Sequence, residues 1–119
     1  MQRFTDLRVW TQAHDLTLTK YRLSQLFPKH ETYGVTSQLR RAADSVAANI
    51  AEGSKRKTNA EYARFLNIAE ASLAETEYLL ILARDLEYLP TESADGMIAS
   101  CNTLARGLGA LRAKVEAHA

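Results

Sequence analysis

Apolar residues recur at steps of three and four positions along almost the whole of this 119-residue chain. This spacing is typical of helices that bury one face, and no segment alternates apolar and polar residues as a half-buried strand does. Only two prolines and five glycines interrupt the pattern, which is few for a loop-rich or all-β architecture. The sequence therefore predicts an all-α fold, and the chain length predicts one domain over residues 1–119.

Four helices are expected, over residues 6–27, 34–53, 58–89 and from 91 onward, and a proline lies directly after the first helix and after the third. Asp6 and Thr91 are the expected N-caps of the first and fourth helices. Gly53 suits a left-handed C-cap, and Thr58 with Glu61 matches a capping box. Because the connections are short, we expect an antiparallel up-down-up-down four-helix bundle.

Residues 78–82, Tyr-Leu-Leu-Ile-Leu, place apolar groups all around the third helix. Such a helix is usually buried on more than one side. We expect it to pack against another subunit as well as its own bundle, in a homo-oligomer. The alternative is a central position within a monomer.

Charge is strongly segregated along the chain, although the net charge is only +1. Residues 40–65 hold six of the 15 cationic side chains, whereas residues 70–95 carry seven acids against the single base Arg84. A local excess of positive charge creates a field that attracts anions. The basic stretch is therefore the candidate functional segment.

The predicted nucleic-acid-binding residues are the six cations of that stretch: Arg40, Arg41, Lys55, Arg56, Lys57 and Arg64. Arginine chelates phosphate with its planar fork, and lysine adds a less directional charge. Tyr62 and Phe65 have helical phases that favour the core, so recognition of the backbone or shape is expected rather than base stacking. The alternative is that these cations only complement the end of the second helix and the nearby carboxylates of Asp44, Glu52 and Glu61.

Two further polar residues of the second helix are predicted to be structural. Asn49 falls on or near the apolar side, where a buried amide must find hydrogen-bond partners. Glu52 and Glu61 flank the basic segment, and capping or salt bridges explain them more simply than an acid–base pair does.

No catalytic, metal or cofactor site is predicted, and we expect a non-enzymatic protein. The residues three before His14, His30 and His118 are not glutamates, so the Glu-x-x-His pairs of di-iron bundles are missing, and no phosphate-binding glycine loop occurs. Cys101, the single cysteine, lies in an apolar helical stripe that favours packing. The longest apolar run is too short to cross a bilayer, which predicts a cytoplasmic protein with no membrane association.

The chain resembles a known family in an ordered series of motifs: Phe4-x-Asp6-Leu7-x-Val9-Trp10, Gln38-x-Arg40-Arg41-Ala42-Ala43 and Asn49-Ile50-Ala51-Glu52-Gly53. These are similar to the four-helix-bundle proteins encoded by intervening sequences of bacterial large-subunit ribosomal RNA, also called S23-type ribosomal proteins. The resemblance implies a ring-like homopentamer. It also implies a relation to accessory proteins of diversity-generating retroelements, which bind nucleic acid and a reverse transcriptase through a basic surface. Of the six cations only Arg40, Arg41 and Arg56 match the shared motif.

The sequence supports two hypotheses of function. In the first, an oligomeric bundle binds RNA or DNA phosphates, with RNA favoured by the family association alone. In the second, the protein is an assembly module that recognises a protein, and its acidic third helix meets a basic partner. The balanced net charge, unlike that of a strongly basic accessory protein, keeps the second hypothesis open.

Overall fold

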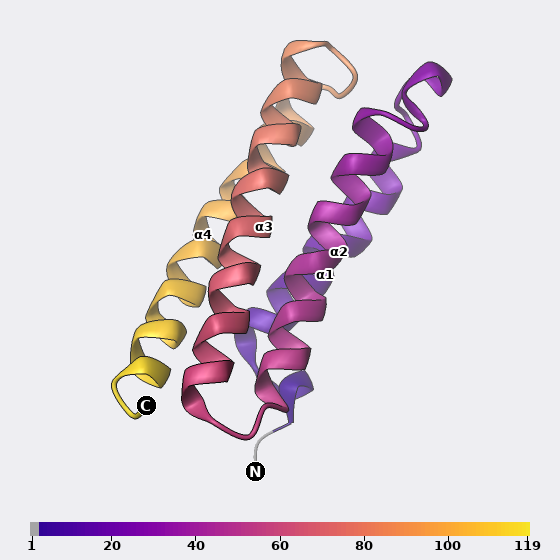
Figure 1. Ribbon diagram of the computed structural model, residues 1–119. Helices are drawn as coiled ribbons and strands as arrows, with labels where there is room; N and C mark the ends of the chain where they lie inside the picture. The colour runs from indigo at the N-terminus through magenta and orange to yellow at the C-terminus, as the bar shows by residue number, and fades with distance from the viewer. Residues whose placement is uncertain (1–2) are drawn as a thin grey trace.

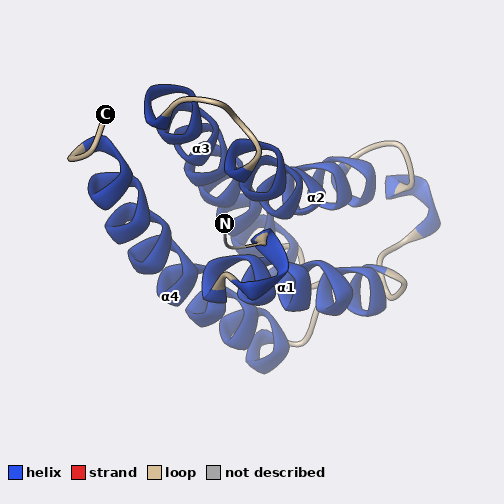
Figure 2. Cartoon of the chain, turned by 90° about the horizontal axis from the view of Figure 1, so that it is seen from below, coloured by secondary structure: helices blue, strands red, loops and turns tan. Residues whose placement is uncertain are grey.

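The computed structural model describes residues 3–119 and consists of four helices joined by short connections (Figure 1). The helices are α1 (Arg8–Ser24), α2 (Val35–Ser54), α3 (Asn59–Asp85) and α4 (Thr91–Glu116), with short 3-10 turns η1 (Phe4–Asp6) and η2 (Lys29–Glu31). The described residues contain no strand (Figure 2). The prediction of an all-α fold with four helices is confirmed.

The helices lie side by side in an elongated body of 45 × 24 × 20 Å. The connection between α2 and α3 lies at the same end as η1 and the C-terminus, and we call this the α2–α3 end (Figure 1). The connection between α3 and α4 lies at the opposite end together with η2, and we call this the α3–α4 end. α2 packs extensively on α3 and α3 on α4, whereas α1 and α4 share the smallest interface between helices that touch.

The core is a column of aliphatic side chains that includes several alanines. Each of α2, α3 and α4 contributes fully buried aliphatic residues, among them Val46, Ile50, Leu66, Leu80, Leu104 and Leu108. Ala13, Ala43 and Ala69 are completely buried, and their small side chains let neighbouring helices approach. The helical periodicity seen in the sequence is therefore the periodicity of one continuous core.

Two predicted helix caps are wrong. Asp6 lies in η1 and Leu7 occupies the N-cap position of α1, while Pro90 occupies the N-cap of α4 and Thr91 is its first residue. Neither helix has a side-chain hydrogen bond at its N-cap. Hydrophobic contacts outweigh capping at these positions, because Leu7 packs against the core and Leu89, next to Pro90, is buried.

The predicted capping box at the start of α3 is half formed. Thr58 Oγ1 accepts a hydrogen bond from the backbone N–H of Glu61 at 3.2 Å, as predicted. The Glu61 carboxylate does not return to the N-cap and instead pairs with Arg64, whose Nε lies 2.9 Å from Glu61 Oε2. A charged partner one turn ahead competes successfully with the uncharged backbone donor.

Gly53 is not a left-handed C-cap, which corrects the sequence prediction. It lies inside α2, and no glycine among residues 3–119 has a positive φ. A Cβ added to Gly53 would lie 2.7 Å from the Cβ of Phe65 and 3.1 Å from Cδ1 of Tyr62. The glycine is thus required by the close approach of α3 rather than by its backbone conformation.

A single carboxylate joins the start of α2 to the connection between α3 and α4. Glu31 Oε1 accepts a hydrogen bond from the N–H of Val35 at 3.3 Å, and Glu31 Oε2 accepts one from the Tyr88 hydroxyl at 2.6 Å. The Tyr88 hydrogen bond lowers the pKa of Glu31 and in turn raises the pKa of the Tyr88 phenol. A Cβ on Gly34 would displace the Glu31 Oε1 atom from this position.

The apolar segment of α3 is buried on only part of its circumference. Leu79 and Leu80 are in the core, and Ile81 and Leu82 are half-buried. Tyr78 is 61% exposed on the outer side. The bundle therefore leaves an aromatic surface on α3 uncovered.

Candidate nucleic-acid interface

The connection between α2 and α3 displays two unpaired cations. Lys55 follows the last residue of α2, and Lys57 precedes the Thr58 cap of α3. Both side chains are exposed, and neither makes a hydrogen bond or ion pair within residues 3–119. Their ammonium groups are available to a phosphate in solution.

Two arginines lie beside these lysines on the ring of Phe65. The guanidinium carbons of Arg56 and Arg64 are each 4.9 Å from the centroid of that ring. Such contacts are cation–π interactions, and they hold a guanidinium in place at a surface. The Cβ of Phe65 can lie this close to α2 because Gly53 has no side chain there.

The core assignment of the two aromatic residues is correct for one of them. Tyr62 is half-buried against the core, and burial raises the pKa of its phenol. Phe65 is also half-buried but is not among the residues packed on the core, so its predicted core position is wrong. Its helical phase directs it toward the end of α2, where the arginines cover it.

The two arginines already have hydrogen-bond partners in α2 and α3. Arg56 Nε donates to the carbonyl of Glu52 at 3.2 Å, so this side chain does complement the end of α2. Arg64 binds the Glu61 carboxylate with two nitrogens, which lowers the pKa of Glu61 and raises the pKa of Arg64. Arg56 and Arg64 therefore complement the end of α2 and a nearby carboxylate, as the alternative interpretation expects. Lys55 and Lys57 are unpaired and are free to bind phosphate.

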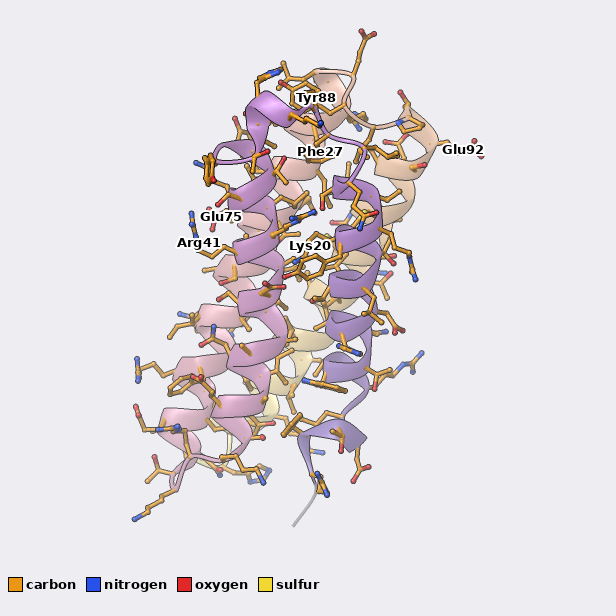
Figure 3. All side chains as sticks on the ribbon, turned by 90° about the vertical axis from the view of Figure 1, so that its right-hand side faces the viewer. Lys20, Phe27, Arg41, Glu75, Tyr88 and Glu92 are labelled. Atoms are coloured by element: carbon orange, nitrogen blue, oxygen red, sulfur yellow. The ribbon has the colours of Figure 1, made fainter. Side chains whose placement is uncertain are left out.

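Arg40 and Arg41 are separated from the other four cations. Arg41 lies in α2, 14 positions before Lys55 at its C-cap, a distance of about 21 Å along a helix. Arg41 is exposed on the outer flank of the bundle, where Glu75 of α3 also points (Figure 3). Arg40 is half-buried, and its Nε donates to Ser24 Oγ at 3.0 Å. The structure therefore gathers four of the six predicted residues at the α2–α3 end.

Arg40 belongs instead to a polar cluster around Lys20, which lies between α1 and α2 (Figure 3). Lys20 is 0% exposed, and its Nζ donates to the Arg40 carbonyl at 3.0 Å and to Asp44 Oδ1 at 2.6 Å. The same Nζ lies 3.5 Å from the centroid of the Tyr21 ring, and the Tyr21 hydroxyl donates to Asp44 Oδ2 at 3.0 Å. Burial lowers the pKa of Lys20, and the Asp44 carboxylate opposes that effect.

Sequence reasoning does not find this cluster. Lysine is almost always exposed unless it is paired, so no local signal marks position 20 as buried. The sequence suggests Asp44 only as a countercharge to the arginines around it. Its true partner comes from α1, and only the packing of α1 on α2 brings the two together.

Asn49 takes part in a polar link between α2 and α3. Its Nδ2 donates to the carbonyl and to Oγ of Ser45, both at 2.8 Å. Ser45 Oγ lies 2.9 Å from Ser72 Oγ on α3. Glu52 is exposed, and its backbone carbonyl rather than its carboxylate makes the local contacts. These positions suit the structural role expected of Asn49.

The remaining candidates offer no reactive group. Within residues 3–119, no group of three or more His, Cys, Asp or Glu residues is placed to hold a metal ion. Cys101 is 1% exposed, and burial, followed by the nearby Glu77 carboxylate, raises the pKa of its thiol to about 12. No helix in the described part of the chain is long and apolar enough to cross a membrane.

Comparison with known proteins identifies the family. A solved structure from Bacteroides thetaiotaomicron, described as a protein of unknown function from the S23 ribosomal protein family, is similar with a TM-score of 0.81 and 23% identity. The similarity covers 87% of this chain and 97% of the other and shows a shared fold. No curated protein matches the sequence. The family model for 23S rRNA-intervening sequence proteins matches residues 5–110. This chain therefore belongs to the family of 23S rRNA-intervening sequence proteins.

Proposed function

We propose that the α2–α3 end binds the phosphate backbone of a nucleic acid and that the protein acts without catalysis. The observation that carries this proposal is the pair of exposed, unpaired lysines, Lys55 and Lys57, beside two arginines held on Phe65. Phosphate contacts dominate the affinity of proteins for nucleic acids, and both lysine and arginine supply them.

The geometry favours backbone recognition over base stacking. Stacking on a single strand needs an open aromatic face. Both guanidinium groups lie over the Phe65 ring and occupy the position that a base would take. RNA is the favoured ligand because the family takes its name from intervening sequences of 23S rRNA. Arg41 would contact a ligand long enough to follow α2.

We further propose that the helices form an antiparallel up-down-up-down bundle and that copies of it assemble into a homopentamer. Two contacts along each pair of neighbouring helices run in opposite directions and support the antiparallel order. Between α1 and α2 they are Lys20–Asp44 and Ser24–Arg40. Between α2 and α3 they are Ser45–Ser72 and Gly53–Tyr62, and between α3 and α4 they are Glu70–Arg112 and Arg84–Asp95. The exposed Tyr78, next to half-buried apolar residues of α3, supports association through that face. A ring would repeat the basic end and raise avidity.

Removing the two unpaired lysines should weaken binding selectively. For Lys55→Ala/Lys57→Ala we expect about a tenfold loss of affinity for structured RNA at low salt, because two phosphate contacts are lost. The slope of log K against log salt should fall by about 2. Fluorescence anisotropy of a labelled RNA hairpin, and of duplex DNA in parallel, titrated across salt concentrations gives both numbers.

The matched control is Arg22→Ala/Lys29→Ala, which removes the same charge from exposed positions at or near the α3–α4 end. We expect this variant to bind within about twofold of the unchanged protein, because it keeps the proposed phosphate contacts. It loses only the general electrostatic attraction, which the two variants lose equally. Equal losses in the two variants would show that net charge, and not the α2–α3 end, determines binding.

Association through α3 is tested by placing a charge on it. Tyr78→Asp should shift the assembly from a mass near five times 13.3 kDa toward that of the single chain, because a carboxylate would be buried without a partner. Light scattering after size exclusion measures the mass. Leu18→Asp, at a 44% exposed position on α1, is the control. A monomeric unchanged protein, or an oligomer that is insensitive to Tyr78→Asp, would exclude this interface.

The second candidate is a protein-assembly module, and the pairing of Arg56 with the end of α2 and of Arg64 with Glu61 favours it. In that case RNA affinity would vanish as the salt concentration approaches about 150 mM, where exposed charges are screened beyond about 8 Å. A cytoplasmic location, the retroelement relation and a reverse-transcriptase partner stay predictions.

A further inference from the structure

Three aromatic residues contact one another where α1 begins. The rings of Trp10 and His14 lie parallel, with an angle of 8° between their planes and 5.0 Å between their centroids. Phe4 of η1 meets Trp10 edge-on, with the two centroids 5.3 Å apart. Trp10 is half-buried and packs against the core. It is therefore a fixed support on which the His14 imidazole is stacked.

The His14 ring has one open face. Its side chain is exposed, and within residues 3–119 the ring makes no hydrogen bond and no aromatic contact except the one with Trp10. A parallel stack covers one side of an imidazole and leaves the other side to solvent. Phe65 differs, because two guanidinium groups lie over its ring. His14 therefore offers the kind of flat surface on which RNA-binding proteins stack a base.

The register of α1 on α2 places this stack beside Lys55. The Tyr21 hydroxyl donates to Asp44 Oδ2 and marks one point where the two helices meet. Trp10 lies 11 positions before Tyr21, and Lys55 lies 11 positions after Asp44. Because 11 positions are close to three full turns of a helix, Trp10 and Lys55 keep the helical phases of that contact.

In the proposed antiparallel order, these equal steps along α1 and α2 lead to the same level of the molecule. The packing of η1 on α2 agrees with this, since η1 directly precedes α1. η1 and the start of α1 lie at the α2–α3 end, together with the connection that carries Lys55 (Figure 1). An aromatic face and an unpaired ammonium group are therefore neighbours at this end.

The charge around the stack is slightly positive. The exposed charged residues of η1 and its cap, of the first turn of α1, and of the last turn of α2 with its cap are three cations and two carboxylates: Arg3, Arg8, Lys55, Asp6 and Glu52. Asp15 lines a groove between α1 and α4, and Asp44 is paired with Lys20, so neither adds a free carboxylate here. A phosphate is therefore not repelled, and Lys55 can bind it.

We infer that the α2–α3 end binds an unpaired nucleotide, whose base stacks on His14 while its phosphate contacts Lys55. This inference rests on the proposed phosphate-binding function and adds to it a preference for single-stranded segments over an uninterrupted duplex. Stacking accepts every base, because each base has a flat π-face, so affinity should depend little on sequence. A single strand that flanks a duplex can place its bases on His14 while the duplex phosphates contact the other cations of this end.

The probes are labelled RNA duplexes of equal length that differ only at one end. One is blunt, one carries a single-stranded overhang of about five nucleotides, and one carries an overhang with the same sugar–phosphate backbone but no bases. Fluorescence anisotropy gives the three affinities. We expect the overhang with bases to bind about tenfold more tightly than the abasic overhang, because the two differ only in stacking.

Trp10 is the single tryptophan of the chain, so its fluorescence reports directly on the stack. A base placed on His14 changes the surroundings of the indole ring. The overhang with bases should therefore change the Trp10 emission on binding, whereas the blunt duplex and the abasic overhang should leave it nearly unchanged.

Substitution of His14 separates stacking from phosphate binding. His14→Ala removes the ring at an exposed position, and the helix should stay intact because alanine is the better helix former. We expect about a tenfold weaker affinity for the overhang with bases, and unchanged affinities for the blunt and abasic duplexes. His14→Phe keeps a flat ring and should restore the binding. His30→Ala, the same change at an exposed histidine of the α3–α4 end, is the control.

Two results would overturn the inference: equal affinities for the overhangs with and without bases, or an unchanged affinity of His14→Ala for the overhang with bases. If the blunt duplex still binds and loses affinity in Lys55→Ala/Lys57→Ala, the phosphate-binding function stands and only the stacking fails. If that double variant binds the blunt duplex normally while the overhang still depends on His14, the phosphate-binding function fails and the stacking site remains. Absence of binding to all three duplexes would exclude both.

Discussion

Lys20→Ala should lower the free energy of unfolding by about 2–4 kcal/mol, the range expected for a buried side chain that is also an ionic partner. The substitution leaves a cavity where Lys20 is 0% exposed. It also removes the donor to the Arg40 carbonyl and to Asp44. Urea denaturation followed by circular dichroism at 25 °C measures the loss.

Lys20→Met separates the two contributions, because it keeps most of the volume but no charge. We expect a smaller loss of about 1–2 kcal/mol, since Asp44 is 46% exposed and water can replace its lost partner. Lys29→Ala, at an exposed lysine, should change stability by less than about 0.5 kcal/mol. If Lys20→Ala were as mild as Lys29→Ala, the polar cluster would not contribute to stability.

Gly53→Ala should destabilise the protein by about 1–3 kcal/mol, although alanine is the better helix former by about 1 kcal/mol. The new methyl would lie 2.7 Å from the Cβ of Phe65. That atom is fixed to the backbone of α3 and cannot rotate away, so α2 and α3 must separate locally. Thermal unfolding by calorimetry or circular dichroism measures the effect.

Gly96→Ala is the matched control for Gly53→Ala, because it makes the same change inside another helix with no atom within 4 Å of the new methyl. Here the helix-propensity gain of up to about 1 kcal/mol should appear without opposition. Equal stabilisation by both substitutions would show that α2 and α3 are packed less tightly at Gly53 than the structure has them.

Four helices could be predicted from this sequence because apolar spacing reports burial directly. Their ends could not, because Asp6 and Thr91 have the right side chains for caps but are one position away from the cap itself. Gly53 is the residue type that commonly ends a helix, but its role here is to make room for Phe65 of α3. Local propensity is a weak guide wherever tertiary contacts compete with it.

In the candidate site, the sequence predicts which residues are neighbours along the chain but not which contacts the packing of helices makes. Lys55, Lys57, Arg56 and Arg64 lie together because they are close in sequence on either side of one turn. Its charge alone predicts that Arg40 lies with these four cations. Arg40 instead donates to Ser24 of α1, a contact that depends on the packing of α1 against α2. The Ser45–Ser72 contact similarly depends on the register between α2 and α3, which no local pattern specifies.

The Glu31 carboxylate couples two parts of the chain that are far apart in sequence. It holds the first N–H of α2 with one oxygen and the Tyr88 hydroxyl with the other. Losing either contact leaves the other less well oriented, so the first turn of α2 and the connection between α3 and α4 belong to one cooperative opening unit. Backbone amides in both segments should then exchange with solvent deuterium at linked rates, ahead of the amides in the centre of the bundle.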